Sequence, residues 1–253
     1  MDLLVDIGNA RIKWAVQDSN GWKTGEPLIR QQRAFKDLAR PAWKELETPD
    51  RVIVSSVACE DYRKSVHTWV KRRWKVIPEF LQPEAHQCGV SNAYVAPERL
   101  GADRWANLLA VHAHYKGPTV VIDCGTAITI DAIAGDGTHL GGLIVPGMDL
   151  MTTALTEGAQ GIQIQEQDKQ EVSLLGRSTE AAVSGGVLYA AVSLIDRVSL
   201  DLKVELGNAA TILLTGGDSI RIMPLLSSKP DYDPDLVLKG LAVFAEETAS
   251  CVT

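Results

Sequence analysis

Two short segments of the chain carry the residue types that can hold a phosphate group. Residues 3–16 read LLVDIGNARIKWAV, and residues 120–133 read VVIDCGTAITIDAI. In each segment an aspartate and a glycine follow an apolar run, so both fall near the tip of a predicted hairpin. Glycine lets the backbone N–H groups of a tight turn approach a ligand, and such groups form an anion-binding hollow. An aspartate beside a phosphate is tolerated when a cation such as Mg²⁺ lies between them.

A single copy of this pattern would favour a simpler interpretation. An Asp-x-Gly sequence is typical of a tight turn in which the aspartate bonds its own backbone. Here the pattern occurs twice, because residues 6–10 and 123–127 share their Asp, Gly and Ala positions. Two copies favour a duplicated structure, with two similar lobes and phosphate binding in a cleft between them. Lys13 would add a positive charge directed toward the phosphate.

A third polar group, Gly101-Ala102-Asp103-Arg104, stands at the start of a predicted helix. Asp103 could accept a proton as a general base, and the Arg104 guanidinium could bind a substrate carboxylate through two hydrogen bonds. The alternative is structural, because an aspartate in the first turn of a helix interacts favourably with the helix dipole. The four residues alone do not decide between these interpretations.

Strands and helices alternate along the predicted chain, which is typical of α/β domains. In the first half we predict strands at 3–7, 12–16, 51–57 and about 74–78, and helices at 34–47, 60–73 and 102–115. In the second half we predict strands at 119–123, 127–133, 140–145 and 211–215, and helices at 148–156, 178–199 and 235–249. Turns are expected at 21–25 and 135–137, and loops at 83–97 and 160–172.

The turn at residues 116–118, Lys-Gly-Pro, is the predicted boundary between the two lobes. It divides the chain into an N-terminal domain of residues 1–116 and a C-terminal domain of residues 117–253. The final helix is a candidate to pack back on the first lobe.

Composition narrows the range of functions. The chain has 253 residues, a net charge of −7 and a pI of about 5.3, which argues against a nucleic-acid partner. The basic run at residues 71–75 is interpreted as a solvated helix face. Four scattered cysteines predict neither a disulfide framework nor a metal site. No apolar stretch approaches the roughly 18 residues of a membrane span, and no basic leader precedes the first strand, so we expect a cytoplasmic protein without a membrane partner.

Taken together, the motifs resemble those of the type III pantothenate kinase family, within the actin, sugar kinase and Hsp70 ATPase superfamily. The matching segments are DIGNARIKW (6–14), Tyr94, LGADRW (100–105), DCGTAITID (123–131), GGLIVPG (141–147), GRSTEAAVSGG (176–186), LTGGD (214–218) and LVLKGL (236–241). They run in family order over almost the whole chain. The resemblance implies two ribonuclease H-like α/β lobes and ATP-dependent phosphorylation of pantothenate, the first step of coenzyme A synthesis, by a homodimer.

The resemblance also implies roles for particular residues. Asp103 would be the general base, Asp6 would lie near Mg²⁺, and Asp123 would help to hold a monovalent cation, K⁺ or NH₄⁺. The residues implied in ATP binding are Asp6, Ile7, Gly8, Asn9, Ala10, Arg11, Ile12, Lys13 and Thr126. The residues implied in pantothenate binding are Tyr94, Gly101, Ala102, Asp103, Arg104 and Thr179.

One position departs from the family pattern. The first loop usually carries Ser or Thr after its asparagine, and this chain has Ala10 instead. The loop therefore lacks one hydroxyl donor, and we expect altered nucleotide affinity rather than loss of activity. Two other functions remain open from sequence: a kinase of the same superfamily acting on a sugar or polyol, and a nucleotide-binding regulator without catalysis.

Overall fold

The structure, a computed structural model, describes residues 1–19, 21–31, 33–159, 161–162 and 175–250. The chain forms two compact units. Unit 1 contains Met1–Lys116, Gly135–Leu140 and Asp235–Thr253, and unit 2 contains Gly117–Ala134 and Gly141–Pro234. The predicted division into domains of residues 1–116 and 117–253 stays a prediction.

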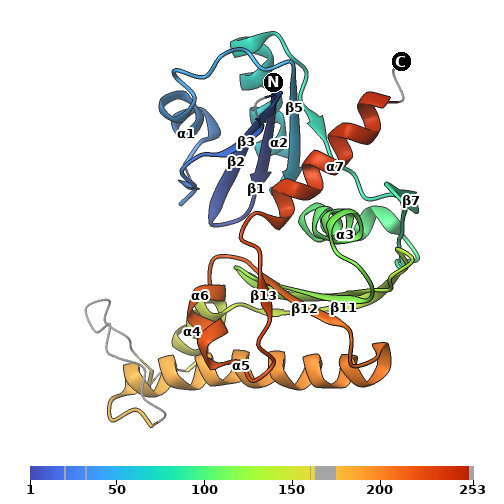
Figure 1. The fold of residues 1–253 in the computed structure, drawn as a ribbon. Helices are drawn as coiled ribbons and strands as arrows, with labels where there is room; N and C mark the ends of the chain where they lie inside the picture. Colours follow the sequence, from blue (N-terminus) through green and yellow to red (C-terminus); the bar gives the residue numbers. More distant parts are fainter. Residues whose placement is uncertain (20, 32, 160, 163–174, 251–253) are drawn as a thin grey trace. The chain divides into compact units, whose positions relative to one another are not determined.

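The sheet of unit 1 has the strand order β3-β2-β1-β5-β6, and β4 also pairs with β2. β1 is antiparallel to β2 and parallel to β5. The bounds are β1 Asp2–Ile7, β2 Arg11–Asp18, β3 Gly21–Thr24, β4 Leu28–Ile29, β5 Arg51–Ser56 and β6 Glu79–Phe80. The helices are α1 Phe35–Ala42, α2 Glu60–Trp74, α3 Ala102–His114 and α7 Leu236–Ser250 (Figure 1). A small hairpin joins β7 His86–Gln87 to β8 Val90–Ser91, and residues Pro97–Arg99 form a 3₁₀ turn.

An aromatic cluster forms the core between the sheet of unit 1 and the helices α1 and α2. Trp43 lies at its centre with an exposed fraction of 1%, and Phe35, Trp69 and Trp74 surround it with ring centroids 5.6–5.9 Å away. Trp14 of β2 meets Trp43 edge to face at 6.0 Å. Buried aromatic side chains contribute large apolar areas, so this cluster holds α1 and α2 on the sheet.

Two predictions in unit 1 are wrong. The predicted turn at 21–25 is mostly strand β3, which continues the sheet because Trp22 pairs with Gln17 of β2. The predicted strand at about 74–78 begins only at Glu79. Trp74 instead ends α2 with its side chain buried, and Lys75 caps the helix in the left-handed conformation with φ of 64°.

The sheet of unit 2 has the order β11-β10-β9-β12-β13, with β9 antiparallel to β10 and parallel to β12. This order corresponds to β3-β2-β1-β5-β6 of unit 1, where β4 is an additional strand. The bounds are β9 Thr119–Cys124, β10 Ala127–Ile133, β11 His139–Pro146, β12 Thr211–Thr215 and β13 Asp231–Tyr232. The helices are α4 Met148–Gly158, α5 Thr179–Leu206 and α6 Ser219–Ile222, and Met223–Leu225 form a 3₁₀ turn. The predicted loop 160–172 lies, apart from residues 161 and 162, outside the described residues.

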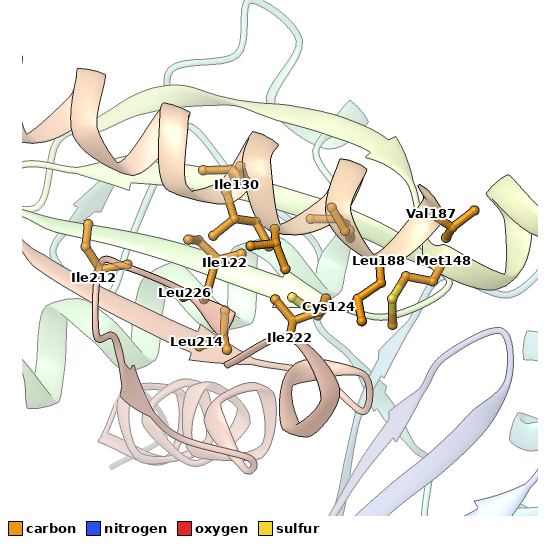
Figure 2. Packing of buried hydrophobic residues seen from close by; sticks show 14 of the residues in the cluster. Ile122, Cys124, Ile130, Met148, Val187, Leu188, Ile212, Leu214, Ile222 and Leu226 are labelled. Carbon is orange, nitrogen blue, oxygen red and sulfur yellow. The ribbon is translucent and has the colours of Figure 1, made fainter. Parts of the chain in front are cut away.

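The long helix α5 covers one face of this second sheet. Figure 2 shows its Val187 and Leu188 packed with Ile122 and Cys124 of β9 and with Met148 of α4. By length and composition α5 could also cross a membrane, although 39% of its most apolar window is buried in the protein. This finding is weak evidence, because a core helix of a soluble protein meets the same test.

Candidate active site

The first phosphate-loop candidate is the tip of the β1–β2 hairpin. The Gly8 N–H donates to the Arg11 carbonyl at 3.0 Å, which closes the turn. Asp6 and Lys13 are paired directly across the two strands, so the carboxylate and the ammonium group leave the same face of the sheet. Side chains alternate along a strand, and the face opposite Asp6 packs Val5 and Ile7 into the aromatic cluster. The side chains of Asp6 and Lys13 therefore point away from the aromatic cluster.

The second candidate loop is the tip of the β9–β10 hairpin in unit 2. Here the Gly125 N–H donates to the Ala127 carbonyl at 3.0 Å, and Asp123 pairs with Thr129 on β10 and Thr215 on β12. The two hairpins therefore share their plan, but the second turn is shorter. Ala127 corresponds in structure to Arg11, so the sequence match of Ala10 with Ala127 is wrong.

Two glycines allow close packing around this second loop. Gly147 donates its N–H to the Thr126 carbonyl at 2.9 Å, and a Cβ at Gly147 would lie 2.2 Å from the Gly125 carbonyl oxygen. Gly216 has φ of +96°, and a Cβ there would lie 2.4 Å from the Cys124 carbonyl oxygen and 2.5 Å from Asp123 Oδ1. These contacts explain why the VPG and TGG sequences contain glycine at these positions.

The third candidate group lies at the N-terminus of α3 in unit 1. Gly101 is the N-cap residue, and Asp103 Oδ1 accepts a hydrogen bond from the Arg104 amide at 2.8 Å. A Cβ at Gly101 would lie 2.6 Å from that same oxygen, so glycine makes room for the carboxylate. The carboxylate of Asp103 is therefore held in one orientation at a helix N-terminus, where negative charge is stabilised.

Arg104 and Tyr94 join this group through direct contacts. Arg104 is 4% exposed, its Nη1 donates to the Tyr94 hydroxyl at 2.8 Å, and its guanidinium carbon lies 5.5 Å from the Tyr94 ring centroid. His139, 2% exposed, stacks on the same tyrosine: its ring centroid lies 6.2 Å from that of Tyr94 at an interplanar angle of 19°. The Ala93 N–H donates to His139 Nδ1 at 3.4 Å.

The structure thus brings some predicted residues together. Within unit 1, Asp6 and Lys13 share one strand pair, and Tyr94, Asp103 and Arg104 form one contact group. Three other predicted residues, Asp123, Thr126 and Thr179, belong to unit 2. Thr179 is the first residue of α5, directly after the N-cap Ser178, whose hydroxyl accepts from the Ala181 amide at 3.2 Å.

Four residues near these groups were not predicted as site residues. His139 belongs to none of the sequence motifs described above, and only the stacking on Tyr94 reveals its position. Ser55 of β5 is fully buried and pairs with Asp6 of β1. In unit 2 the corresponding pair is Thr215 of β12 with Asp123 of β9. Arg30, which lies outside the first loop in sequence, donates hydrogen bonds to the Gly8 and Ala10 carbonyls of that loop. The duplicated strand order could have suggested Ser55 and Thr215, whereas no sequence signal marks Arg30 or His139.

Three further features of the described residues were considered as alternative functional sites: metal-ligand groups, the Cys124 thiol and a hollow between α1 and α2. The part of the chain that the structure describes contains no group of three or more His, Cys, Asp or Glu that could hold a metal ion. Burial raises the pKa of the Cys124 thiol to about 12, so this cysteine stays neutral and acts as a small core residue. A hollow of about 990 Å³ between α1 and α2 is lined by Phe35, Trp69 and charged side chains, and by none of the predicted site residues.

Comparison with solved structures shows the fold. A conserved protein of the Baf family of transcriptional activators from Campylobacter jejuni is 24% identical, with a TM-score of 0.58 over 98% of this chain and 99% of that one. A glucokinase from an Antarctic psychrotroph is 12% identical, with a TM-score of 0.50 over 97% and 98% of the two chains. With the duplicated sheets, this similarity shows the α/β fold of the actin, sugar kinase and Hsp70 ATPase superfamily, and the predicted fold class is confirmed.

Comparison of sequences then defines the family. The profile described as type III pantothenate kinase matches residues 2–200. The type III pantothenate kinase of Nitrosococcus oceani is 43% identical over 98% of this chain and 95% of its own length. That of Nitrosospira multiformis is 34% identical over 98% and 92%. The chain belongs to the type III pantothenate kinase family.

Proposed function

We propose that this protein transfers the γ-phosphoryl group of ATP to the primary hydroxyl of pantothenate, with Asp103 as the general base. Family membership makes the chain an enzyme, a pantothenate kinase, which catalyses the first step of coenzyme A synthesis. The observation that carries the assignment of the base is the anchored carboxylate of Asp103, in contact with the Arg104 amide at the start of α3.

Phosphoryl transfer depends mainly on positioning and electrostatics around a loose transition state. Asp103 would orient the pantothenate hydroxyl and accept its proton late in the transfer. The hydrogen bond from the Arg104 amide fixes one carboxylate oxygen, so the carboxylate needs little reorganisation during the reaction. Tyr94, Gly101, Ala102, Arg104 and Thr179 are the proposed pantothenate-binding residues. Because Arg104 is nearly buried, we assign it to holding Tyr94 and supplying positive charge.

For ATP, the first loop from Asp6 to Lys13 is the proposed phosphate cradle, and Thr126 of the second loop is a further ATP contact. A bound Mg²⁺ would neutralise charge on the phosphate oxygens. One carboxylate, Asp6, suits this ion because Mg²⁺ usually takes one or two carboxylates and completes its shell with water and phosphate. Lys13, paired across the strands with Asp6, would place its ammonium group toward the phosphate.

Asp123 is the proposed ligand of a monovalent cation. We expect Gly216→Ala to raise the K⁺ concentration for half-maximal activity by roughly tenfold or more, because the new Cβ would displace the Asp123 carboxylate. The measurement is initial rate against K⁺ concentration at saturating ATP and pantothenate. Gly207→Ala is the matched control, since Gly207 has a similar φ of +97° and a Cβ there would meet nothing within 4 Å. Equal K⁺ dependence in both variants would contradict the role of Asp123.

The function is tested most directly by ATP turnover with and without pantothenate. We expect ADP release that depends on pantothenate and yields one equivalent of phosphorylated product. Glucose, glycerol and pantetheine serve as competing acceptors, because a polyol kinase would prefer one of the first two. Nucleotide binding without any acceptor-dependent turnover would favour a regulator and would contradict the proposal.

We also propose a homodimer in the cytoplasm. Tyr189, Leu200 and Val204 of α5 are 38%, 61% and 78% exposed, and their spacing places them along one face of the helix. An apolar face of this kind supports association with a second copy, which would also account for the hydropathy of α5 without a membrane.

We expect Leu200→Glu combined with Val204→Glu to convert the dimer into a monomer, because two charges would have to be buried in the interface. Sedimentation equilibrium gives the mass in solution. Val95→Glu in unit 1 is the control, since Val95 is apolar and fully exposed but lies outside α5. A wild-type protein that sediments as a monomer would disprove the dimer.

A further inference from the structure

Arg30 contacts the first phosphate-loop candidate through two hydrogen bonds, one from its side chain and one from its backbone. Its guanidinium Nη1 donates to the Gly8 carbonyl at 3.0 Å. Its backbone N–H donates to the Ala10 carbonyl at 2.9 Å. Both acceptors belong to the turn between β1 and β2, and one of them is the residue that replaces the usual hydroxyl-bearing side chain.

These two hydrogen bonds determine where the amide groups of the loop point. In a trans peptide the N–H and the C=O lie on opposite sides of the C–N bond, and the described chain contains no cis peptide. The carbonyls of Gly8 and Ala10 are directed at Arg30, so the N–H groups of Asn9 and Arg11 point away from it. Backbone N–H groups that face one side of a tight turn can bind an anion there.

The position of Arg30 is itself fixed by its neighbours. The preceding residues form β4, in which Leu28 and Ile29 pair with Ile12 and Arg11 of β2. Beyond it, Gln31 adopts a left-handed φ of 34°, and the Arg33 N–H donates to the Arg30 carbonyl at 2.6 Å. The backbone of Arg30 is therefore held against the loop by a strand pair on one side and a turn on the other.

The guanidinium is supported by an aromatic side chain of α2. Its carbon lies 4.0 Å from the centroid of the Tyr62 ring, within the range of a cation–π contact. Tyr62 meets Phe35 edge to face at 6.1 Å, which connects this contact to the aromatic core. Burial raises the pKa of the Tyr62 hydroxyl, although the charge of Arg30 opposes the shift, so the ring is uncharged at neutral pH.

We propose that Arg30 is a positioning residue for ATP: it clamps the Gly8–Arg11 turn through two carbonyls and thereby preorganises the phosphate-binding amides. The usual hydroxyl at position 10 would supply one more hydrogen-bond donor to the phosphates. In this chain the clamp makes the Gly8–Arg11 turn more rigid and so offsets the loss of that donor. This inference rests on the proposed function, because it requires that the first loop binds the phosphates of ATP.

The test compares Arg30→Met, Arg30→Lys and Arg33→Met. Arg33 is the matched control because its guanidinium contacts the Asp37 carbonyl, outside the loop. We expect Arg30→Met to raise both the Kd for Mg·ATP, measured by calorimetry, and the KM for ATP by roughly tenfold, the effect of losing one charge-assisted hydrogen bond. The KM for pantothenate should stay within about twofold of the wild-type value, a split that general destabilisation would not produce. Arg30→Lys should fall between Arg30→Met and the wild type, and Arg33→Met should match the wild type.

A second pair of variants tests the aromatic support. Tyr62→Phe keeps the ring and should bind Mg·ATP like the wild type, whereas Tyr62→Leu should weaken binding by roughly threefold. Thermal unfolding of every variant identifies any that fail to fold. If Arg30→Met does not fold, Arg30→Lys is compared with the wild type instead.

The outcomes separate the two proposals. If Lys13→Met weakens Mg·ATP binding and Arg30→Met does not, the clamp is disproved while the phosphate loop stands. If neither change alters Mg·ATP binding by a folded, active enzyme, the loop assignment itself fails. If the wild-type protein shows no pantothenate-dependent turnover, the proposed function fails independently of both variants.

Discussion

Asp103→Asn is expected to lower kcat by roughly 10²- to 10⁴-fold, the usual contribution of a general base. The amide has nearly the same shape as the carboxylate and can still accept the Arg104 N–H through its oxygen, so the local fold is retained. Because the substitution removes the proton acceptor and leaves the binding surface nearly unchanged, the KM for pantothenate should change little. Steady-state kinetics with both substrates varied gives kcat and KM separately.

A matched control exists within the chain. Asp149 is the second residue of α4, as Asp103 is the second residue of α3, and both helices have a glycine N-cap. Asp149→Asn therefore removes the same favourable interaction with a helix dipole at an exposed position. If Asp103 served only the helix N-terminus, the two variants would have equal turnover and equal loss of stability. A fully active Asp103→Asn enzyme would disprove the assignment of the base.

Gly240→Ala is expected to destabilise the protein by about 3 kcal/mol, at the upper end of the usual cost of overpacking. Gly240 lies on α7 where that helix crosses α3, and a Cβ there would lie 1.9 Å from the Ala106 carbonyl oxygen and 2.5 Å from its carbon. The obstructing atoms are backbone, so they cannot move away as a flexible side chain could. α3 would have to shift, and with it Asp103 and Arg104, so turnover should also fall.

Gly186→Ala provides the comparison for this stability measurement. Gly186 also lies within a helix, α5, and nothing stands within 4 Å of the position of its Cβ. Replacing an unhindered helical glycine with alanine stabilises a protein by roughly 0.5–1 kcal/mol. Urea unfolding at one protein concentration should therefore give shifts of opposite sign for the two variants. A Gly240→Ala variant at least as stable as the wild type would show that the α3–α7 contact tolerates the extra methyl group.

Much of the fold followed from sequence because local patterns and the fold agree. The apolar runs before Asp6 and Asp123 became β1 and β9, and the duplicated Asp-x-Gly tips predicted two related sheets. Residues 102–115 were predicted as a helix, and α3 ends one residue earlier. The errors came where tertiary contacts overrode local signals. The segment at 21–25 has the residues of a turn, yet Trp22 forms strand pairs with β2.

The candidate site was predictable only in part, for a related reason. Asp6, Lys13 and Asp103 stand within continuous motifs, so their neighbours in sequence are also their neighbours in space. Arg30 and His139 reach their partners across longer stretches of chain, Gly8 in the one case and Tyr94 in the other. Neither residue has a local signal, because its role depends on where β4 and residues 135–140 pack. The shorter second hairpin was hidden because Ala10 and Ala127 coincide in sequence but not in register.

The aromatic cluster of unit 1 has a spectroscopic consequence. All six tryptophans of the chain lie in the residues assigned to unit 1, and unit 2 has none. Indole fluorescence excited selectively at the red edge of the absorption band will therefore report the unfolding of unit 1, whereas far-ultraviolet circular dichroism will report both units. If the two spectroscopic transitions do not coincide in urea, the units unfold as separate cooperative bodies.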